Sequence, residues 1–137
     1  MRKTILLGAM FLSSLAFAQQ KSPVLGGDRD VHGCIGSAGY TYSQIKNDCV
    51  KVFAQKIKLK EVGSDKSSTS MTAVIFSKDM KRAEVFISEG AAKSIILERE
   101  GKSKIWKSGS YIKETYVLVP YKKAGYQLKK DDVVIYQ

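Results

Sequence analysis

Short stretches of alternating apolar and polar residues fill the sequence from residue 54 onward, and they most constrain how the chain can fold. Lys56 to Lys60 alternates strictly, which is typical of a strand with one buried and one solvated face. Met71 to Phe76 is apolar on both faces and suits a central strand. Because turn residues separate these stretches at close intervals, the pattern predicts an antiparallel meander. The predicted strands cover residues 56–60, 71–76, 83–87, 94–99, 104–106, 115–121 and 133–136.

The predicted fold class is therefore mainly β, with no long amphipathic helix. An antiparallel sheet must cover or close its edges, so we expect the meander to curl or to form a small barrel. A β-sandwich is the alternative. We expect a single β-rich domain over residues 28–137, because a chain of this length can bury one core. It would contain a Cys-tied segment (28–53) and the antiparallel sheet (54–137).

The Cys-tied segment differs from the sheet in composition. Glycines recur at every third position between residues 33 and 39, which opposes a helix and permits tight turns. We expect a compact Gly-rich loop followed by a short hairpin or turn. Cys34 and Cys49 are the two cysteines, and an even count in an exported protein favours a disulfide. Metal-binding or redox thiols are the alternative, although redox pairs usually have the closer C-x-x-C spacing.

Residues 1–18 predict export. Arg2 and Lys3 precede an apolar stretch that ends in Ala16-Phe17-Ala18, and this order is typical of a secretory signal peptide. The apolar stretch is too short to span a bilayer, and no later one is longer, so we do not expect an integral membrane protein. Residues 19–27 are interpreted as a flexible lead-in because of their proline and glycines. We therefore expect an exported protein, either periplasmic or extracellular.

The chain is strongly basic, with a formal net charge of +10, and removal of the leader would leave about +8. Such a charge attracts phosphates, carboxylates and acidic glycans. In the C-terminal third, aromatic residues that could stack on sugars or bases alternate with lysines. The expected partner is an anionic polysaccharide, lipopolysaccharide or extracellular nucleic acid, although core packing and a solubilising surface could explain the same residues. The predicted ligand-binding residues are Lys102, Lys104, Trp106, Lys107, Tyr121, Lys122, Lys123, Lys129 and Lys130.

Asp28, Asp30 and His32 alternate just before Cys34 and would point to one side of an extended segment. Two carboxylates and an imidazole could ligate a metal ion. A zinc site that added Cys34 and Cys49 would need reduced thiols, which export disfavours. Alternatively, the aspartates cap backbone N–H groups in a Gly-rich turn and His32 forms a local hydrogen bond. We favour the capping role, and we expect no resident metal or other cofactor.

Residues that could support catalysis are sparse. His32 is the sole histidine, and Ser37 lies in a G-S-A-G sequence that is not a G-x-S-x-G nucleophile elbow. The glutamates lie beside lysines or on strand faces that we expect to be solvated, where a raised carboxyl pKa for acid catalysis is not expected. We therefore expect a non-enzymatic binding protein. The glutamates in question are Glu61, Glu84, Glu89, Glu98, Glu100 and Glu114.

The stretch from Gly26 to Tyr40, GGDRDVHGCIGSAGY, followed by Cys49, resembles a segment of small exported bacterial proteins with the pattern GGDxDxHGCxxSAGY. Tyr42 stands where such segments often carry tryptophan. The resemblance implies export and a folded unit. The meander is similar, at the level of fold alone, to the small barrels of periplasmic lysozyme inhibitors. The alternative function is inhibition of an extracellular hydrolase, of lysozyme or protease type, by a rigid Gly33–Tyr40 loop.

Overall fold

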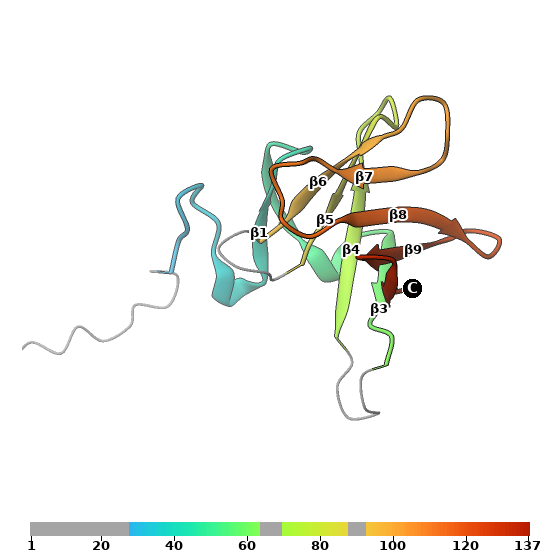
Figure 1. Ribbon diagram of the computed structural model, residues 1–137. Coiled ribbons are helices and arrows are strands. Elements are labelled where there is room, and N and C mark those ends of the chain that lie inside the picture. The colour runs from blue at the N-terminus through green and yellow to red at the C-terminus, as the bar shows by residue number, and fades with distance from the viewer. Residues whose placement is uncertain (1–27, 64–69, 88–92) are drawn as a thin grey trace, which may run out of the picture.

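The computed structural model describes residues 28–63, 70–87 and 93–137, so the predicted signal peptide (1–18) and lead-in (19–27) lie outside the described residues. The described residues form ten strands and two short 3-10 helices (Figure 1). The fold is therefore mainly β, as the sequence predicts. No described helix has the length and apolar character needed to cross a membrane.

Eight strands form one antiparallel sheet that is nearly closed into a barrel, and consecutive strands are neighbours throughout. At the seam, the backbones of Lys60 and Gln137 exchange two hydrogen bonds, with N–O distances of 2.8 and 2.9 Å. These bonds satisfy backbone groups that an open edge would leave unpaired. The strands are β3 (Ile57–Lys60), β4 (Met71–Phe76), β5 (Arg82–Val85), β6 (Ile95–Arg99), β7 (Trp106–Ser108), β8 (Tyr116–Tyr121), β9 (Gly125–Lys130) and β10 (Val133–Tyr136).

The inner faces of these strands form the main hydrophobic core. Leu97, Leu118 and Leu128 are completely buried, and Trp106 lies among them with its ring centre 4.8 Å from that of Phe76. Leu118 is paired in register with Trp106 on one side and with Leu128 on the other. Apolar side chains at alternate positions of successive strands thus meet inside the barrel, which is why the period-two pattern predicts this fold.

Strand β9 is a correction to the sequence-based prediction, which placed no strand between residues 121 and 133. Tyr126 and Leu128 alternate with polar neighbours and pack with the barrel core. Asp131 and Asp132 then connect β9 to β10 with φ angles of 48° and 66°. Two successive residues with positive φ are typical of the tight turns that link hairpin strands. The polar residues Lys129 to Asp132 therefore include both the end of β9 and the two-residue turn that follows it.

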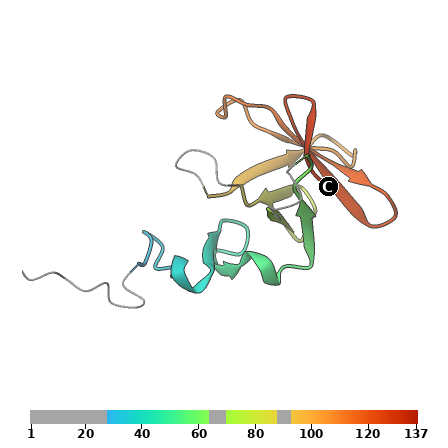
Figure 2. The ribbon, with the colours of Figure 1, turned by 90° about the horizontal axis from the view of Figure 1, so that it is seen from below.

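The Cys-tied segment packs against the outside of the barrel on one side (Figure 2). A disulfide joins Cys34 to Cys49, as predicted. A two-stranded hairpin follows the Gly-rich loop, also as predicted, and pairs Tyr42 with Cys49 in register. The elements of this part of the chain are η1 (Gly36–Ala38), β1 (Tyr40–Ser43), β2 (Asp48–Lys51) and η2 (Val52–Ala54).

This packing explains why β4 is apolar on both faces. Val74 belongs to the core inside the barrel. Ala73 and Ile75 belong to a second cluster with Phe86, on the opposite face of the strand. That second cluster is covered by side chains from the Cys-tied segment and the helix after it, namely Ile45, Val50 and Val52.

Glu84 is completely buried, whereas we expected it on a solvated strand face. Its position does face outward, but the turn of the hairpin covers it. The carboxylate accepts hydrogen bonds from the hydroxyls of Ser43 at 2.6 Å and Ser94 at 2.7 Å, and from the backbone N–H groups of Gln44 at 2.9 Å and Ile45 at 3.2 Å. One buried carboxylate on β5 therefore anchors the hairpin to the barrel.

Candidate functional site

Three turns leave the same end of the barrel, because successive strands of a meander run in opposite directions. They follow β4, β6 and β8 and span residues 77–81, 100–105 and 122–124. Figure 1 shows them spread from the top to the right of the view. We call these three turns the basic end, because the exposed lysines on them are Lys78, Lys81, Lys102, Lys104, Lys122 and Lys123.

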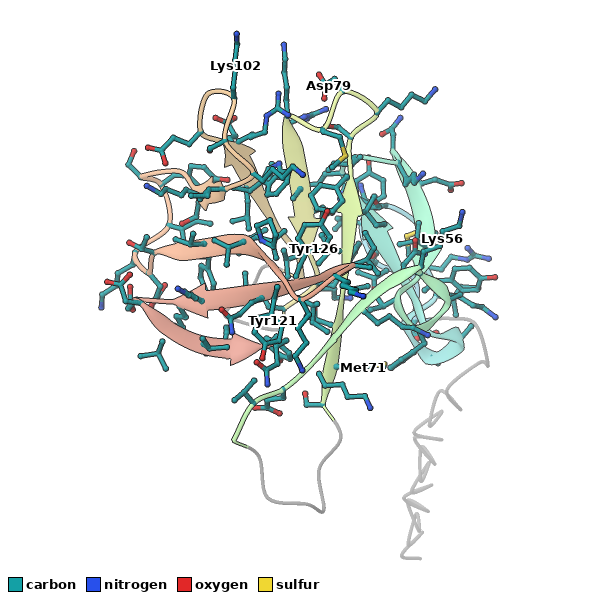
Figure 3. All side chains as sticks on the ribbon, turned by 90° about the vertical axis from the view of Figure 1, so that its right-hand side faces the viewer. Lys56, Met71, Asp79, Lys102, Tyr121 and Tyr126 are labelled. Carbon is teal, nitrogen blue, oxygen red and sulfur yellow. A yellow bond between two sulfur atoms is a disulfide. The ribbon has the colours of Figure 1, made fainter. Side chains whose placement is uncertain are left out.

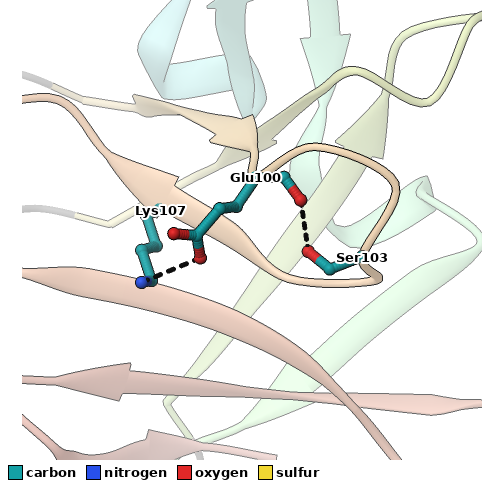
Figure 4. Close-up of polar contacts among 3 residues, drawn as sticks. All are labelled: Glu100, Ser103 and Lys107. Atoms are coloured by element: carbon teal, nitrogen blue, oxygen red, sulfur yellow. Dashed lines mark hydrogen bonds and ion pairs between the residues drawn. The ribbon is translucent and has the colours of Figure 1, made fainter.

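The two acidic residues of the basic end are both engaged. The Asp79 carboxylate accepts hydrogen bonds from the Ser77 hydroxyl at 2.6 Å and from the Lys81 N–H at 3.0 Å. These bonds, with the Ser77 hydroxyl contributing most, lower the pKa of Asp79. Glu100 forms an ion pair with Lys107, and its Oε2 atom lies 2.9 Å from the Lys107 Nζ atom (Figure 4). Neither carboxylate forms an ion pair with a lysine of the basic end.

The lysines of the basic end are therefore available to external anions. Glu100–Lys107 is the one ion pair within the described ranges 28–63, 70–87 and 93–137. Figure 3 shows Lys102 extending away from the barrel above its turn, with Asp79 on the neighbouring turn. The Lys122 ammonium lies 5.2 Å from the centre of the Tyr121 ring, a cation–π distance that leaves its charge uncompensated by a carboxylate.

Two described connections at the other end of the barrel have the opposite balance. The β7–β8 connection carries Lys113 and Glu114, and the β9–β10 turn consists of Asp131 and Asp132. Asp131 also accepts a hydrogen bond from the Thr115 N–H at 2.9 Å. The three turns of the basic end thus carry a net positive charge, whereas these two connections together carry a net negative one.

Five of the predicted ligand-binding residues lie in or beside turns of the basic end. Lys102 and Lys104 lie on the β6–β7 turn, and Tyr121, Lys122 and Lys123 lie in or beside the β8–β9 turn. The prediction missed the contribution of the β4–β5 turn, which is distant in sequence. The alternating direction of meander strands was the signal that could have placed all three turns together. The residues missed are Lys78 and Lys81.

The other predicted ligand-binding residues lie elsewhere. Trp106 is 2% exposed inside the barrel, so its ring cannot contact a ligand on the surface, and this part of the prediction is corrected. Trp106 instead fills space in the hydrophobic core of the barrel. Lys130 lies over the ring of buried Tyr116, 5.7 Å from its centre. Lys107 and Lys129 both neighbour β8 in the sheet, away from the turns.

A shallow pocket of about 440 Å³ lies where the β4–β5 and β6–β7 turns meet. The Arg99 N–H donates to the Lys81 carbonyl at 2.8 Å and joins the two turns. The buried side-chain Nε of Arg99 has no hydrogen-bond partner among the described residues. An unpaired buried donor is costly, and an anion could satisfy it. The residues around this pocket are Asp79, Lys81, Arg82, Glu98, Arg99 and Gly101.

Asp28 and Asp30 hold the Gly-rich loop, which agrees with the capping interpretation. One Asp30 oxygen accepts the N–H groups of His32 and Cys34, both at 2.9 Å, and the Cys34 bond is the main cause of the lowered pKa of Asp30. Asp28 accepts both the N–H and the hydroxyl of Ser37, which lower its pKa in that order. Among the described residues, no three His, Cys, Asp or Glu side chains are grouped to hold a metal ion.

The Gly33–Tyr40 loop is braced at both ends. Gly33 and Gly39 have φ angles of 83° and 80°, a conformation that favours glycine. The Gly39 N–H donates to the Gly36 carbonyl at 2.9 Å, and the disulfide fixes the loop to β2. Exposed apolar side chains flank this loop, since Val31 is 96% exposed and Phe53 is 65% exposed.

A second pocket, of about 490 Å³, opens between the Cys-tied segment and the start of β6. His32 forms the expected local hydrogen bond through its backbone N–H, which donates to Asp30. Its ring stacks in parallel on that of Tyr42, with centres 3.7 Å apart and planes 9° apart. The Tyr42 hydroxyl donates to the Asn47 side-chain oxygen. The pocket is lined by Arg29, Asp30, Val31, His32, Thr41, Tyr42, Gln44, Lys93 and Ser94.

No protein-family model, curated protein or solved structure matches this chain. The resemblance of the Gly26–Tyr40 stretch to small exported bacterial proteins therefore stays a prediction.

Proposed function

We propose that this protein is a non-enzymatic binding protein that holds an anionic polymer at the basic end. The observation that carries the proposal is the grouping of six exposed lysines, none in an ion pair, on three turns of one barrel end. Clustered cations raise the local concentration of polyanions and accelerate their association. A polymer gains more than a small anion, because several of its charges can be neutralised at once with release of counterions.

The proposed polymers are acidic polysaccharide, lipopolysaccharide and extracellular nucleic acid. All three carry repeated negative charges outside the cytoplasm, where we propose that the protein is exported. The Cys34–Cys49 disulfide is consistent with such an oxidising location. Tyr121, beside the lysines of the β8–β9 turn, adds an aromatic side chain that can pack against a sugar or a base.

Retention on heparin resin in a salt gradient tests the proposal. We expect the wild-type protein to be retained at physiological salt. A triple variant, Lys102→Gln, Lys104→Gln and Lys123→Gln, should elute at much lower salt. The slope of log K against log salt should fall by about 0.7 for each lysine that contacts the polymer.

The matched control removes the same charge elsewhere on the surface, through Lys58→Gln, Lys60→Gln and Lys113→Gln. These lysines are exposed and lie outside the basic end. The control variant should keep most of the retention. Equal losses in the two triple variants would show that net charge alone, rather than the basic end, determines binding. No retention of the wild type would remove the proposal altogether.

The second candidate function is inhibition of an extracellular hydrolase by the Gly33–Tyr40 loop. The bracing of this loop by the disulfide, Asp28 and Asp30 favours it, because a rigid loop loses little conformational entropy on binding. We expect any inhibition of a lysozyme or protease panel to be lost in the double variant Cys34→Ser, Cys49→Ser and kept in the lysine triple variant. Inhibition that survives the double variant would exclude the loop.

A further inference from the structure

We infer that the pocket between the Cys-tied segment and β6 is a binding site for a single acidic sugar unit. The pocket opens at the start of β6, whereas the basic end lies at the other end of these strands, so this inference does not rest on the proposed function. Its volume of about 490 Å³ lies in the range of small-molecule sites, roughly 300 to 1,000 Å³. Apolar and aromatic lining with a few polar groups is typical of such sites.

The charged groups of the pocket select for an anion. Arg29 and Lys93 both line it, and a guanidinium can bind a carboxylate through two N–H groups. Arg29 donates one N–H to the Gly33 carbonyl at 2.7 Å, which fixes its side chain and leaves its remaining N–H groups as donors. The acidic group that lines the pocket, Asp30, already accepts two backbone N–H groups at one of its oxygens.

The stacked rings suit a ligand that packs by one face. Tyr42 covers one face of the His32 ring, and the exposed His32 borders the pocket together with Tyr42. Aromatic rings pack against the apolar face of a sugar, and they also stack on nucleobases. The exposed ring therefore fits an acidic sugar, and comparison with adenosine monophosphate in the test below distinguishes a nucleotide.

The neutral polar groups of the pocket suit hydroxyls. Thr41, Gln44 and Ser94 line the pocket and can each donate or accept hydrogen bonds. The Gln44 side-chain N–H donates to the Ser94 hydroxyl at 3.4 Å, and that hydroxyl donates to buried Glu84 at 2.7 Å. These groups are thus held in place before a ligand arrives, which reduces the entropic cost of binding.

The test is titration of the oxidised protein, observed by amide NMR, with D-glucuronate and with D-glucose at matched sodium chloride. We expect glucuronate to shift the amides of His32, Tyr42 and Ser94, and glucose to leave them unchanged. Lys93→Gln should weaken glucuronate binding about tenfold, because a charge-assisted hydrogen bond is lost. Lys113→Gln removes the same charge outside the pocket and should leave the affinity unchanged.

Two further variants distinguish the contribution of the His32 ring from that of the positive charges. His32→Ala should weaken glucuronate binding several-fold, and His32→Phe, which keeps an aromatic ring, should restore most of it. The amide spectrum of each variant shows whether it is folded, and His32→Phe provides the comparison if His32→Ala is not. Rescue by phenylalanine would support a stacking role, whereas equal weakening in both variants would overturn that role.

Several outcomes would overturn the inference. Glucose shifting the same amides as strongly as glucuronate would remove the selection for charge. Inorganic phosphate or adenosine monophosphate binding more tightly than glucuronate would replace the acidic sugar with a phosphate or a nucleotide. Shifts confined to residues 77–81 and 100–105 would assign the ligand to the basic end. Loss of heparin retention alone would leave this inference intact, because the lysine triple variant does not alter the pocket.

Discussion

The Cys-tied segment and the barrel reach an ordered structure by different means. The barrel buries completely apolar residues such as Leu97, Leu118 and Leu128 in one continuous core. The Cys-tied segment contributes only a small apolar cluster to its contact with β4, and it relies on a disulfide, two capping aspartates and a buried glutamate. A short segment cannot bury enough apolar area alone, so covalent and polar constraints take the place of a core.

The largest expected effect comes from Glu84, which links the two regions. In Glu84→Ala, the buried hydroxyl of Ser43 and three partly buried donors would lose the acceptor that they share. Each such group costs about 1–3 kcal/mol, so we expect the free energy of unfolding to fall by at least about 3 kcal/mol. Urea denaturation measures it. The control Glu98→Ala alters an exposed residue on the neighbouring strand and should change stability by less than about 0.5 kcal/mol.

A loss below about 1 kcal/mol in Glu84→Ala would contradict the anchoring role. Hydrogen exchange gives a second, local readout. The amides of Gln44 and Ile45 donate to the Glu84 carboxylate, so they should lose protection in the variant before the amides of the barrel core do. Equal loss of protection everywhere would show that Glu84 stabilises the whole molecule rather than the junction.

The next effect comes from the disulfide. Cys34 and Cys49 are 15 residues apart, and the chain-entropy estimate for closing such a loop is about 3 kcal/mol. In Cys34→Ser, Cys49→Ser we expect that loss to appear in the Cys-tied segment, while the barrel stays folded. Trp106, the single tryptophan, is buried in the barrel, so its fluorescence reports the barrel alone.

In the double variant, the Cys-tied segment and the barrel should unfold in two separate transitions in urea. Amide protection of the hairpin should disappear first, and the fluorescence of Trp106 should change at a higher urea concentration. Coincident transitions would mean that the two regions unfold as one cooperative unit. A double variant as stable as the wild type would show that the polar contacts suffice without the covalent link.

The smallest effect is a dependence on acid pH. Backbone N–H groups lower the pKa of Asp30 below its ordinary value of about 3.9. The stabilisation by Asp30 should therefore be complete above about pH 4 and disappear as the pH falls through the lowered pKa of the folded state. The stability difference between wild type and Asp30→Ala, measured from pH 6 to pH 2, should shrink on acidification. A difference that stays constant would contradict this.

The sequence predicted the barrel well because its period-two pattern is local. The pattern of Lys56–Lys60 predicts a strand with one solvated face, and that of Met71–Phe76 predicts a strand buried on both faces. Both are strands in the structure, within one residue of the predicted bounds. Strand β9 was not predicted, because a tight turn of two aspartates directly follows its lysines. In the sequence, the end of the strand and the turn form one continuous polar stretch. Alternation of Tyr126 and Leu128 with polar residues was the signal that could have revealed it.

The candidate sites were harder to predict, because they depend on contacts between distant residues. Alternation correctly placed Glu84 on the outer face of its strand, but nothing local indicates that a hairpin some forty residues earlier covers that face. Trp106 fits a ligand platform and a core equally well by sequence, and its burial is decided by its neighbours in the barrel. The stacking of His32 on Tyr42 likewise depends on how the loop folds back onto the hairpin.

The uneven charge of the barrel has a consequence for how the molecule meets a charged surface. The basic end carries six lysines, whereas the β7–β8 and β9–β10 connections at the other end carry Lys113, Glu114, Asp131 and Asp132, so the two differ in the sign of their net charge. Near a negatively charged layer, the field exerts a torque that rotates the lysine-bearing turns inward. Adsorbed molecules would then share one orientation, with the basic end against the charged layer and the β7–β8 and β9–β10 connections toward the solution.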